Sequence, residues 1–276
     1  MVAVKIDNTS AGLPQYGVTG ADIVYVEQVE GGLTRLLSVF HTNLPSEVGA
    51  VRSVRTTDAE LLPVFGTPAL VFSGGGGVPL EALAATPTIA ISEDGAGPGF
   101  WRSNSARAPF NLHSNLQTVV GSVSGISQPN NIGLVFAADD PRVGAAPPAT
   151  SLRVQYQAAR VEFAAEGGGY RLIRNGDGET DAEGAPIVTD NVVFQDVAFE
   201  PDGEFDSVGS PSFISHTVGN GTFTLFRDGH AIAGTWSRPA ADQPTQYLDA
   251  AGQPVPFKPG KTWVALVPPI ASVSVS

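Results

Sequence analysis

The 276-residue chain contains no cysteine and no long hydrophobic run. The absence of cysteine excludes disulfides, thiolate metal ligands and a cysteine nucleophile. No apolar run reaches the length of about 18 residues that a membrane-spanning helix needs. The first residues, MVAVKIDN, lack the basic and apolar regions of a signal peptide. Any targeting segment would therefore lie upstream of this sequence.

Positive charge and histidine are also scarce. The chain has 15 Lys and Arg against 27 Asp and Glu, which gives a net charge of −12. A nucleic-acid or anionic-membrane surface needs clustered positive charge, so we expect no nucleic-acid partner and only a local anion site. The 4 histidines are not paired at the spacing of metal ligands. We therefore expect no cofactor and no bound metal.

The composition is that of a globular protein, with 42% hydrophobic and 15% charged residues. Gly (32) and Pro (22) are abundant and long helical periodicities are few, so the sequence predicts a strand-rich α+β fold. Residues 1–140 are expected to form a mixed N-terminal part with a central β-hairpin and several helices. Residues 137–150 resemble a linker, and residues 150–276 are expected to form a β-rich meander.

The central hairpin is predicted at residues 22–41, DIVYVEQVEGGLTRLLSVFH. Two runs rich in β-branched and aromatic residues flank Gly31-Gly32, a pair typical of a two-residue turn. Such a turn places Gln28 opposite Arg35 and moves Glu27 to the other face of the sheet. Near the turn, a polar cluster stands on an otherwise apolar element; its members are Glu27, Gln28, Glu30, Thr34 and Arg35.

Three helix starts are expected in the first 117 residues. Thr57–Glu60 and Ser114–Gln117 have the spacing of a capping box, and Pro79 suits the first turn of a helix after the glycine run 74–77. Helix N-termini present free N–H groups and a positive dipole end, so each is a potential anion site. The glycine run lacks the Gly-Lys-Ser/Thr of a P-loop, which makes nucleotide binding a weak hypothesis.

Two arginines, Arg52 and Arg55, precede the first of these helices. One hypothesis is that they bind a phosphate or carboxylate group there. The alternative is that they pair with Glu27 or Glu30 in a buried salt-bridge network, because buried charges occur only when paired. A hard-cation site from Asp7, Glu27 and Glu30 would need a bulge, since residues 27 and 30 alternate to opposite faces of a regular strand.

Several segments together indicate a family. They are AVKIDN (3–8), EQVEGGLTRLLSVF (27–40), GAVRSVR (49–55), FWR (100–102), APFNLH (108–113), DNVV (190–193), GNGTFTLFRDGHAIAGTW (219–236) and PGKTWVALVP (259–268). In these segments the chain resembles the YerB-like lipoprotein family, a bacterial group without an assigned activity. The resemblance implies an α+β fold with two unlike parts and an exported protein held by a lipid anchor upstream of this sequence. It gives no residue a catalytic role.

These observations predict an extracytoplasmic, lipid-anchored domain that binds a small anionic or polyol cell-envelope ligand in a polar cleft. One alternative is a hydrolase of envelope glycan, peptide or phosphodiester with Glu27 or Glu30 as general base. Another is a structural partner of a membrane complex that docks through the β-rich half. The residues predicted to line the cleft are Asp7, Asn8, Glu27, Glu30, Arg35, Arg52, Arg55, Arg102, Asn111 and His113.

Overall fold

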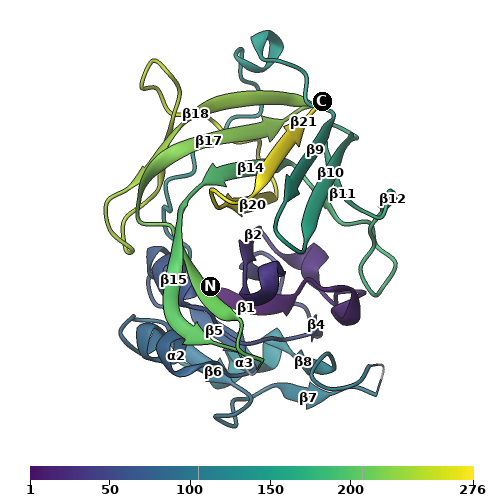
Figure 1. Ribbon diagram of the computed structural model, residues 1–276, viewed down its shortest axis with the longest axis vertical. Coiled ribbons are helices and arrows are strands. Elements are labelled where there is room, and N and C mark those ends of the chain that lie inside the picture. Colours follow the sequence, from purple (N-terminus) through teal and green to yellow (C-terminus); the bar gives the residue numbers. More distant parts are fainter. Residues whose placement is uncertain (105, 207) are drawn as a thin grey trace.

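In the computed structural model, one ten-stranded sheet runs through both halves of the sequence (Figure 1). The structure describes residues 1–104, 106–206 and 208–276. Its strands, in spatial order, are β19 (Gln246–Leu248), β18 (His230–Arg238), β17 (Gly219–Arg227), β14 (Asn191–Asp196), β20 (Thr262–Val267), β2 (Ile23–Gln28), β3 (Thr34–Phe40), β1 (Val2–Asp7), β5 (Ala69–Phe72) and β6 (Ile89–Ser92). The late strand β20 lies parallel to both β14 and β2. The C-terminal half is therefore not the simple meander expected. The two parts predicted from the sequence, residues 1–140 and 150–276, both contribute strands to this sheet. Their division into separate domains stays a prediction.

Three smaller sheets surround the large one. The first has the order β12 (Asp177–Gly178), β11 (Gly169–Arg174), β10 (Arg160–Glu166), β9 (Ser151–Gln155) and β21 (Ser272–Val275), and β13 (Val188–Thr189) also pairs with β11. The second is formed by β4 (Val48–Gly49), β8 (Leu112–Ser114) and β7 (Phe100–Arg102). The third is the hairpin of β15 (Ala198–Phe205) and β16 (Pro211–His216), here called the β15–β16 arm. Residues 131–136 form no strand, and Phe136 makes only an isolated bridge with Phe257.

Helices are short in this sheet-rich fold: α1 (Thr56–Leu61), α2 (Gly77–Ala84) and α3 (Leu116–Ser122). Short 3-10 segments lie at Ser10–Gly12, Val18–Gly20, Glu30–Gly32, Leu62–Phe65 and Val143–Ala145. Helix α2 has Pro79 in its first turn, as expected. The cap of α3 is Asn115, one residue after the predicted Ser114, and its side chain accepts from the Thr118 N–H (2.8 Å). Among the described residues, no helix combines the length and apolarity needed to cross a membrane.

The β2–β3 hairpin turns through three residues and not through the predicted two. The Val29 N–H donates to the Leu33 carbonyl (2.8 Å), and Glu30–Gly32 form the turn. Both glycines of the turn have positive φ, a conformation that costs glycine little. The predicted register was therefore wrong by one residue. Glu27 lies directly opposite Arg35, and the two side chains share one face of the sheet.

Both faces of the large sheet are buried. One face packs against β9–β11 and α3, and the other packs against α1 and the segment that follows it. Leu37 and Val39 lie on the second face. The ladder between β1 and β3 places Lys5 on that same face, opposite Leu37. A single lysine in an apolar strand is thus forced into the core, where it needs a countercharge.

The β15–β16 arm leaves the C-terminal half and lies over α1 and α2 (Figure 1). Thr57 and Glu60, which the sequence predicted to form a capping box, hold this arm instead. The Thr57 hydroxyl accepts from the Ser215 N–H (2.9 Å), and Glu60 contacts His216 (2.8 Å) and the Thr217 N–H (2.7 Å). These contacts hold the base of the arm. Nearer its tip, Asp202 accepts from the Thr56 hydroxyl (2.6 Å) and Glu204 accepts from the Val78 N–H (2.9 Å), so the tip also lies against the N-terminal half.

Candidate functional site

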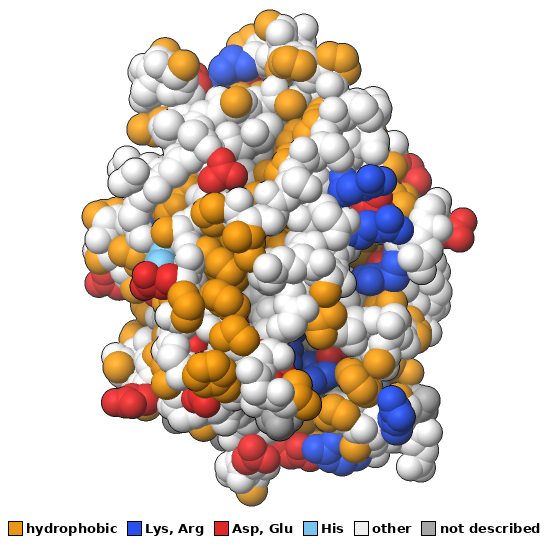
Figure 2. All heavy atoms as spheres, viewed as in Figure 1, with side chains coloured by type: hydrophobic (Ala, Val, Ile, Leu, Met, Phe, Trp, Pro, Cys, Tyr) orange, Lys and Arg blue, Asp and Glu red, His pale blue; other side chains and the backbone are white. Residues whose placement is uncertain are grey.

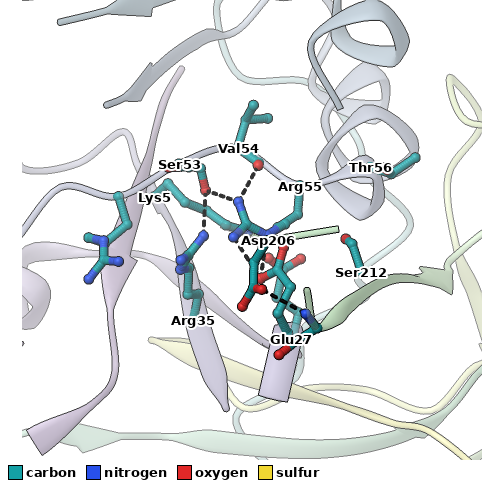
Figure 3. A network of polar contacts seen from close by, with 12 residues as sticks. Lys5, Glu27, Arg35, Ser53, Val54, Arg55, Thr56, Asp206 and Ser212 are labelled. Carbon is teal, nitrogen blue, oxygen red and sulfur yellow. Dashed lines mark hydrogen bonds and ion pairs between the residues drawn. The ribbon is translucent and has the colours of Figure 1, made fainter. Parts of the chain in front are cut away.

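A pocket of about 470 Å³ lies where the end of β1, the β2–β3 turn and the segment before α1 meet. Three guanidinium groups and three carboxylates share this cavity, here called the arginine pocket. One carboxylate, Asp206, comes from the tip of the β15–β16 arm (Figure 3). The lining residues are Asp7, Thr9, Ser10, Ala11, Val29, Glu30, Leu33, Thr34, Arg35, Arg52, Arg55, Phe110 and Asp206.

Two of the three arginines are paired with carboxylates. Arg55 donates from Nε (3.0 Å) and Nη2 (2.6 Å) to the same Glu30 oxygen. Arg52 forms an ion pair with Asp7, and its guanidinium carbon lies 4.9 Å from the centre of the Phe110 ring. The sequence hypothesis of internal pairing therefore holds for Arg55 with Glu30, while Arg52 takes a different partner from the two considered.

The third arginine, Arg35, has no carboxylate within ion-pair distance in the part of the chain that the structure describes. Its Nη1 donates to the Ser53 carbonyl (3.2 Å), toward which Arg55 also points (Figure 3). Only 9% of Arg35 is exposed. Burial, together with the nearby Arg55 and Arg52 charges, lowers the pKa of Arg35 to about 9. The guanidinium is thus still charged at neutral pH and is poorly solvated.

The neighbours of Arg35 explain why it is unpaired. Glu27 and Asp7 lie directly opposite it on the two flanking strands. Each of these carboxylates is bonded to another cation, Glu27 to Lys5 and Asp7 to Arg52. The Asp7 carboxylate also accepts from the backbone N–H of Thr9 (2.6 Å). Neither neighbour therefore neutralises Arg35.

A buried ionic group lies on the same sheet face as Arg35. Lys5 contacts both Glu27 and Asp58, the latter at 2.7 Å, and all three residues are fully buried. Burial and the Asp58 charge raise the pKa of Glu27 to about 7, against the opposing effect of Lys5. Asp58 also accepts from the Arg55 N–H (2.8 Å), which fixes the start of α1. This group ties the sheet to the helix.

Five of the residues predicted for the cleft line the arginine pocket: Asp7, Glu30, Arg35, Arg52 and Arg55. Asn8 lines a neighbouring pocket of about 240 Å³. Glu27 lies on the same sheet face but is not among the lining residues, because the Lys5 contact holds it in the core. Whether these residues bind a ligand stays a prediction.

The remaining three predicted residues belong to the β4–β8–β7 sheet and the loop beside it. Arg102 pairs with Glu93 (2.5 Å) and donates to Asn111 (3.0 Å). The His113 ring lies 4.6 Å from the Tyr16 ring and is buried against it. The structure therefore does not bring Arg102, Asn111 and His113 into the arginine pocket.

A hard-cation site from Asp7, Glu27 and Glu30 is not formed. Each of these carboxylates is bonded to a different basic side chain. Among the described residues, no group of three or more His, Asp or Glu is arranged to hold a metal ion.

Sequence reasoning missed Lys5, Asp58, Phe110 and Asp206. Lys5 carried a usable signal, because it is the only basic residue in the apolar run VAVKI and a buried lysine needs an acidic partner. Asp206 carried none, since it reaches the pocket only through the long-range docking of the β15–β16 arm on α1.

The comparisons with known proteins agree with the sequence resemblance. Residues 1–126 match the family model described as the N-terminal domain of a protein of unknown function (DUF3048), and residues 151–264 match that of its C-terminal domain. The putative lipoprotein YerB of Bacillus subtilis (strain 168) is 28% identical over 294 residues, which cover 100% of this chain and 83% of the relative. The chain belongs to the YerB-like family. A crystal structure of YerB from Bacillus subtilis matches with a TM-score of 0.80 at 25% identity, over 99% of this chain and 93% of that chain.

Proposed function

We propose that the arginine pocket of this YerB-like protein binds a small anionic ligand and that Arg35 is its principal contact. The observation that carries the proposal is the buried Arg35 guanidinium at the wall of a cavity, for which the described residues provide no carboxylate partner. A buried charge is costly unless it is paired. A bound carboxylate or phosphate would provide the missing partner through charge-assisted hydrogen bonds.

The size and chemistry of the cavity support this proposal. Its volume of about 470 Å³ lies within the range of about 300–1,000 Å³ typical of small-molecule pockets. Phe110 and Leu33 supply apolar surface, and Thr9, Ser10 and Thr34 supply hydroxyl groups. A few polar groups on a partly apolar wall are typical of a pocket that orients its ligand.

Asp206 gives the pocket a second recognition element. One oxygen of its carboxylate accepts from the backbone N–H groups of Val208 (3.0 Å) and Ser210 (2.7 Å). The backbone N–H of Ser210 and that of Val208 contribute to a lowered pKa of Asp206, so the group is ionised at neutral pH. Since a carboxylate only accepts hydrogen bonds, Asp206 favours a ligand that carries hydroxyl donors beside its anionic group.

The name of the relative supports a location for the ligand. YerB is named a putative lipoprotein, and a lipid anchor would place this domain outside the cytoplasm at the membrane surface. We propose that the ligand is a soluble or polymeric component of the cell envelope. Docking of the β-rich half on a membrane complex stays a prediction.

The geometry weighs against the hydrolase alternative. The Glu27 pKa of about 7 would suit a general base, but the carboxylate is bonded to Lys5 inside the core and does not line the pocket. Glu30 does line it, yet one of its oxygens accepts two bonds from Arg55. Binding without catalysis therefore agrees better with the contacts.

Calorimetric titration with inorganic phosphate and with acetate tests the proposal. Wild type should bind at least one of them, and Arg35→Met should weaken that binding about tenfold or more, since hydrogen bonds to charged groups contribute about 1.5–3 kcal/mol. Arg102→Met is the matched control, because Arg102 pairs with Glu93 outside the pocket. Equal binding by wild type and Arg35→Met, with both folded, would refute the proposal.

A further inference from the structure

A second, smaller pocket adjoins the arginine pocket. It has a volume of about 240 Å³ and is lined by Asn8, Ala158, Arg160, Arg174 and Asn175, among others. The two pockets share one stretch of wall, formed by Thr9, Ser10, Leu33 and Thr34. A ligand held at Arg35 would therefore reach the second pocket around the ends of β1 and β3, because the Asn8 and Thr34 side chains lie on the opposite sheet face from Arg35.

The charged residues of the second pocket are already paired. Arg174 bonds Glu179 (2.8 Å) and also donates to the Asn8 amide oxygen (2.8 Å). Arg160 bonds Glu162 (2.9 Å). This pocket therefore has no unpaired cation comparable to Arg35, and an anion would gain less here than in the arginine pocket.

What the second pocket offers is hydrogen bonding of both kinds. Side-chain amides and guanidinium groups donate, and amide, hydroxyl and carboxylate oxygens accept. The shared wall adds apolar surface, because Leu33 is 40% exposed although it is a large hydrophobic residue. Figure 2 shows that most of the molecular face in view is uncharged and that its basic side chains lie mainly on the right. Mixed donors and acceptors beside an apolar wall suit a neutral, hydroxyl-rich ring.

We propose that the ligand is an acidic saccharide, with its phosphate or carboxylate at Arg35 and a sugar ring in the second pocket. This inference rests on the proposed function, since it needs the anion site at Arg35. It adds the second pocket and the chemical class of the ligand. Asp206 lines the arginine pocket, and its carboxylate can accept hydrogen bonds from ligand hydroxyl groups, which agrees with the same class.

The experiment compares four probes by calorimetry: inorganic phosphate, glucose, glucose 6-phosphate and glucuronate. When one molecule engages two sites, the second contact becomes intramolecular. Glucose 6-phosphate should therefore bind wild type about tenfold or more tightly than phosphate, and glucose alone should bind weakly. Glucuronate tests whether a carboxylate replaces the phosphate.

Two variants separate the pockets. Ala158 is exposed and lines only the second pocket, so Ala158→Trp fills that pocket without touching Arg35. This variant should bind phosphate as wild type does and should lose the added affinity for the saccharide. Ala250→Trp, at an exposed turn that lines neither pocket, is the control and should change nothing.

The outcomes distinguish this inference from the proposed function. If phosphate binds but neither acidic saccharide binds more tightly than phosphate, the saccharide inference is wrong and the anion site stands. The saccharide inference also fails if Ala158→Trp, shown to be folded, binds glucose 6-phosphate as wild type does. If none of the anionic probes binds, the anion site itself is refuted.

Discussion

Arg35 lies directly opposite Glu27 across the β2–β3 ladder, yet the two do not pair. Glu27 is bonded to Lys5 on the far side of β3, and Arg35 donates to the Ser53 carbonyl. One strand pair thus carries, side by side, a buried carboxylate that is bonded to Lys5 through one oxygen and a buried cation with no carboxylate partner among the described residues. The Glu27–Lys5 contact ties β2 to β1 across β3, whereas Arg35 keeps a charge available at the arginine pocket.

Replacement of Arg55 should cost much more stability than replacement of Arg35. Arg35→Met removes a desolvated charge that lies near two other arginines, so the free energy of unfolding should change by less than about 1 kcal/mol or increase. Arg55→Met leaves the buried Glu30 unpaired and should cost about 3 kcal/mol. Urea unfolding of the two variants and wild type measures both effects. A loss of several kcal/mol for Arg35→Met would show that this arginine serves stability.

Asp206→Asn should strengthen the binding of inorganic phosphate. The substitution removes a negative charge from the pocket and keeps the oxygen that accepts the Val208 and Ser210 N–H groups. Removal of a like charge several ångströms from the ligand, in a partly solvated site, should raise the affinity roughly two- to fivefold. Calorimetry at low ionic strength measures the change. Unchanged affinity would place the anion away from Asp206.

Glu27 should make stability fall as the pH rises. Its pKa is about 7 in the folded protein against 4.5 for an ordinary glutamate, so the folded state holds the proton more tightly. Between pH 4.5 and 7 the unfolded chain ionises first, and the free energy of unfolding decreases through this window. Relative to Glu27→Gln, wild type should lose about 2–3 kcal/mol over this range. A constant difference between the two proteins at pH 5, 6, 7 and 8 would contradict this assignment.

His216 should add a smaller pH effect on the β15–β16 arm. Burial acts to lower its pKa, but contacts with Glu60 (2.8 Å) and Glu200 (3.1 Å) outweigh burial and raise the pKa above 6.5. The histidinium stabilises the folded arm fully below pH 6.5, and this contribution is lost as the pH rises through the raised value. His216→Gln should lack the trend. Thermal unfolding of both proteins from pH 5.5 to 8.5 measures it, and parallel curves would refute it.

The sequence predicted local features better than long-range ones. Alternation and glycine located the β2–β3 hairpin, and Pro79 located the start of α2. The register failed by one residue because three-residue and two-residue turns are both compatible with Gly31-Gly32. The insertion of β20 beside β2 could not be predicted, since no local pattern encodes which distant strand becomes a neighbour.

In the candidate site, too, the sequence predicted local features better than long-range contacts. The segments EGGLTR and VRSVR marked Glu30, Arg35, Arg52 and Arg55, and the structure brings these residues together. Which carboxylate pairs with which arginine depended on the register of β1 against β3, because that register places Asp7 and Lys5. Asn111 and His113 are close to Phe110 in sequence, but only Phe110 lines the pocket. Proximity along the chain was a poor guide to the boundary of the site.

The most direct test is the side-chain ¹H–¹⁵N spectrum of the arginines during a titration with inorganic phosphate. If Arg35 holds the anion, its Nε–Hε resonance shifts and saturates, while that of Arg102 stays in place. Arg35→Met identifies the resonance by its loss. A titration in which the Arg35 resonance does not move, or moves no more than that of Arg102, would contradict the claim that Arg35 is an anion-binding residue.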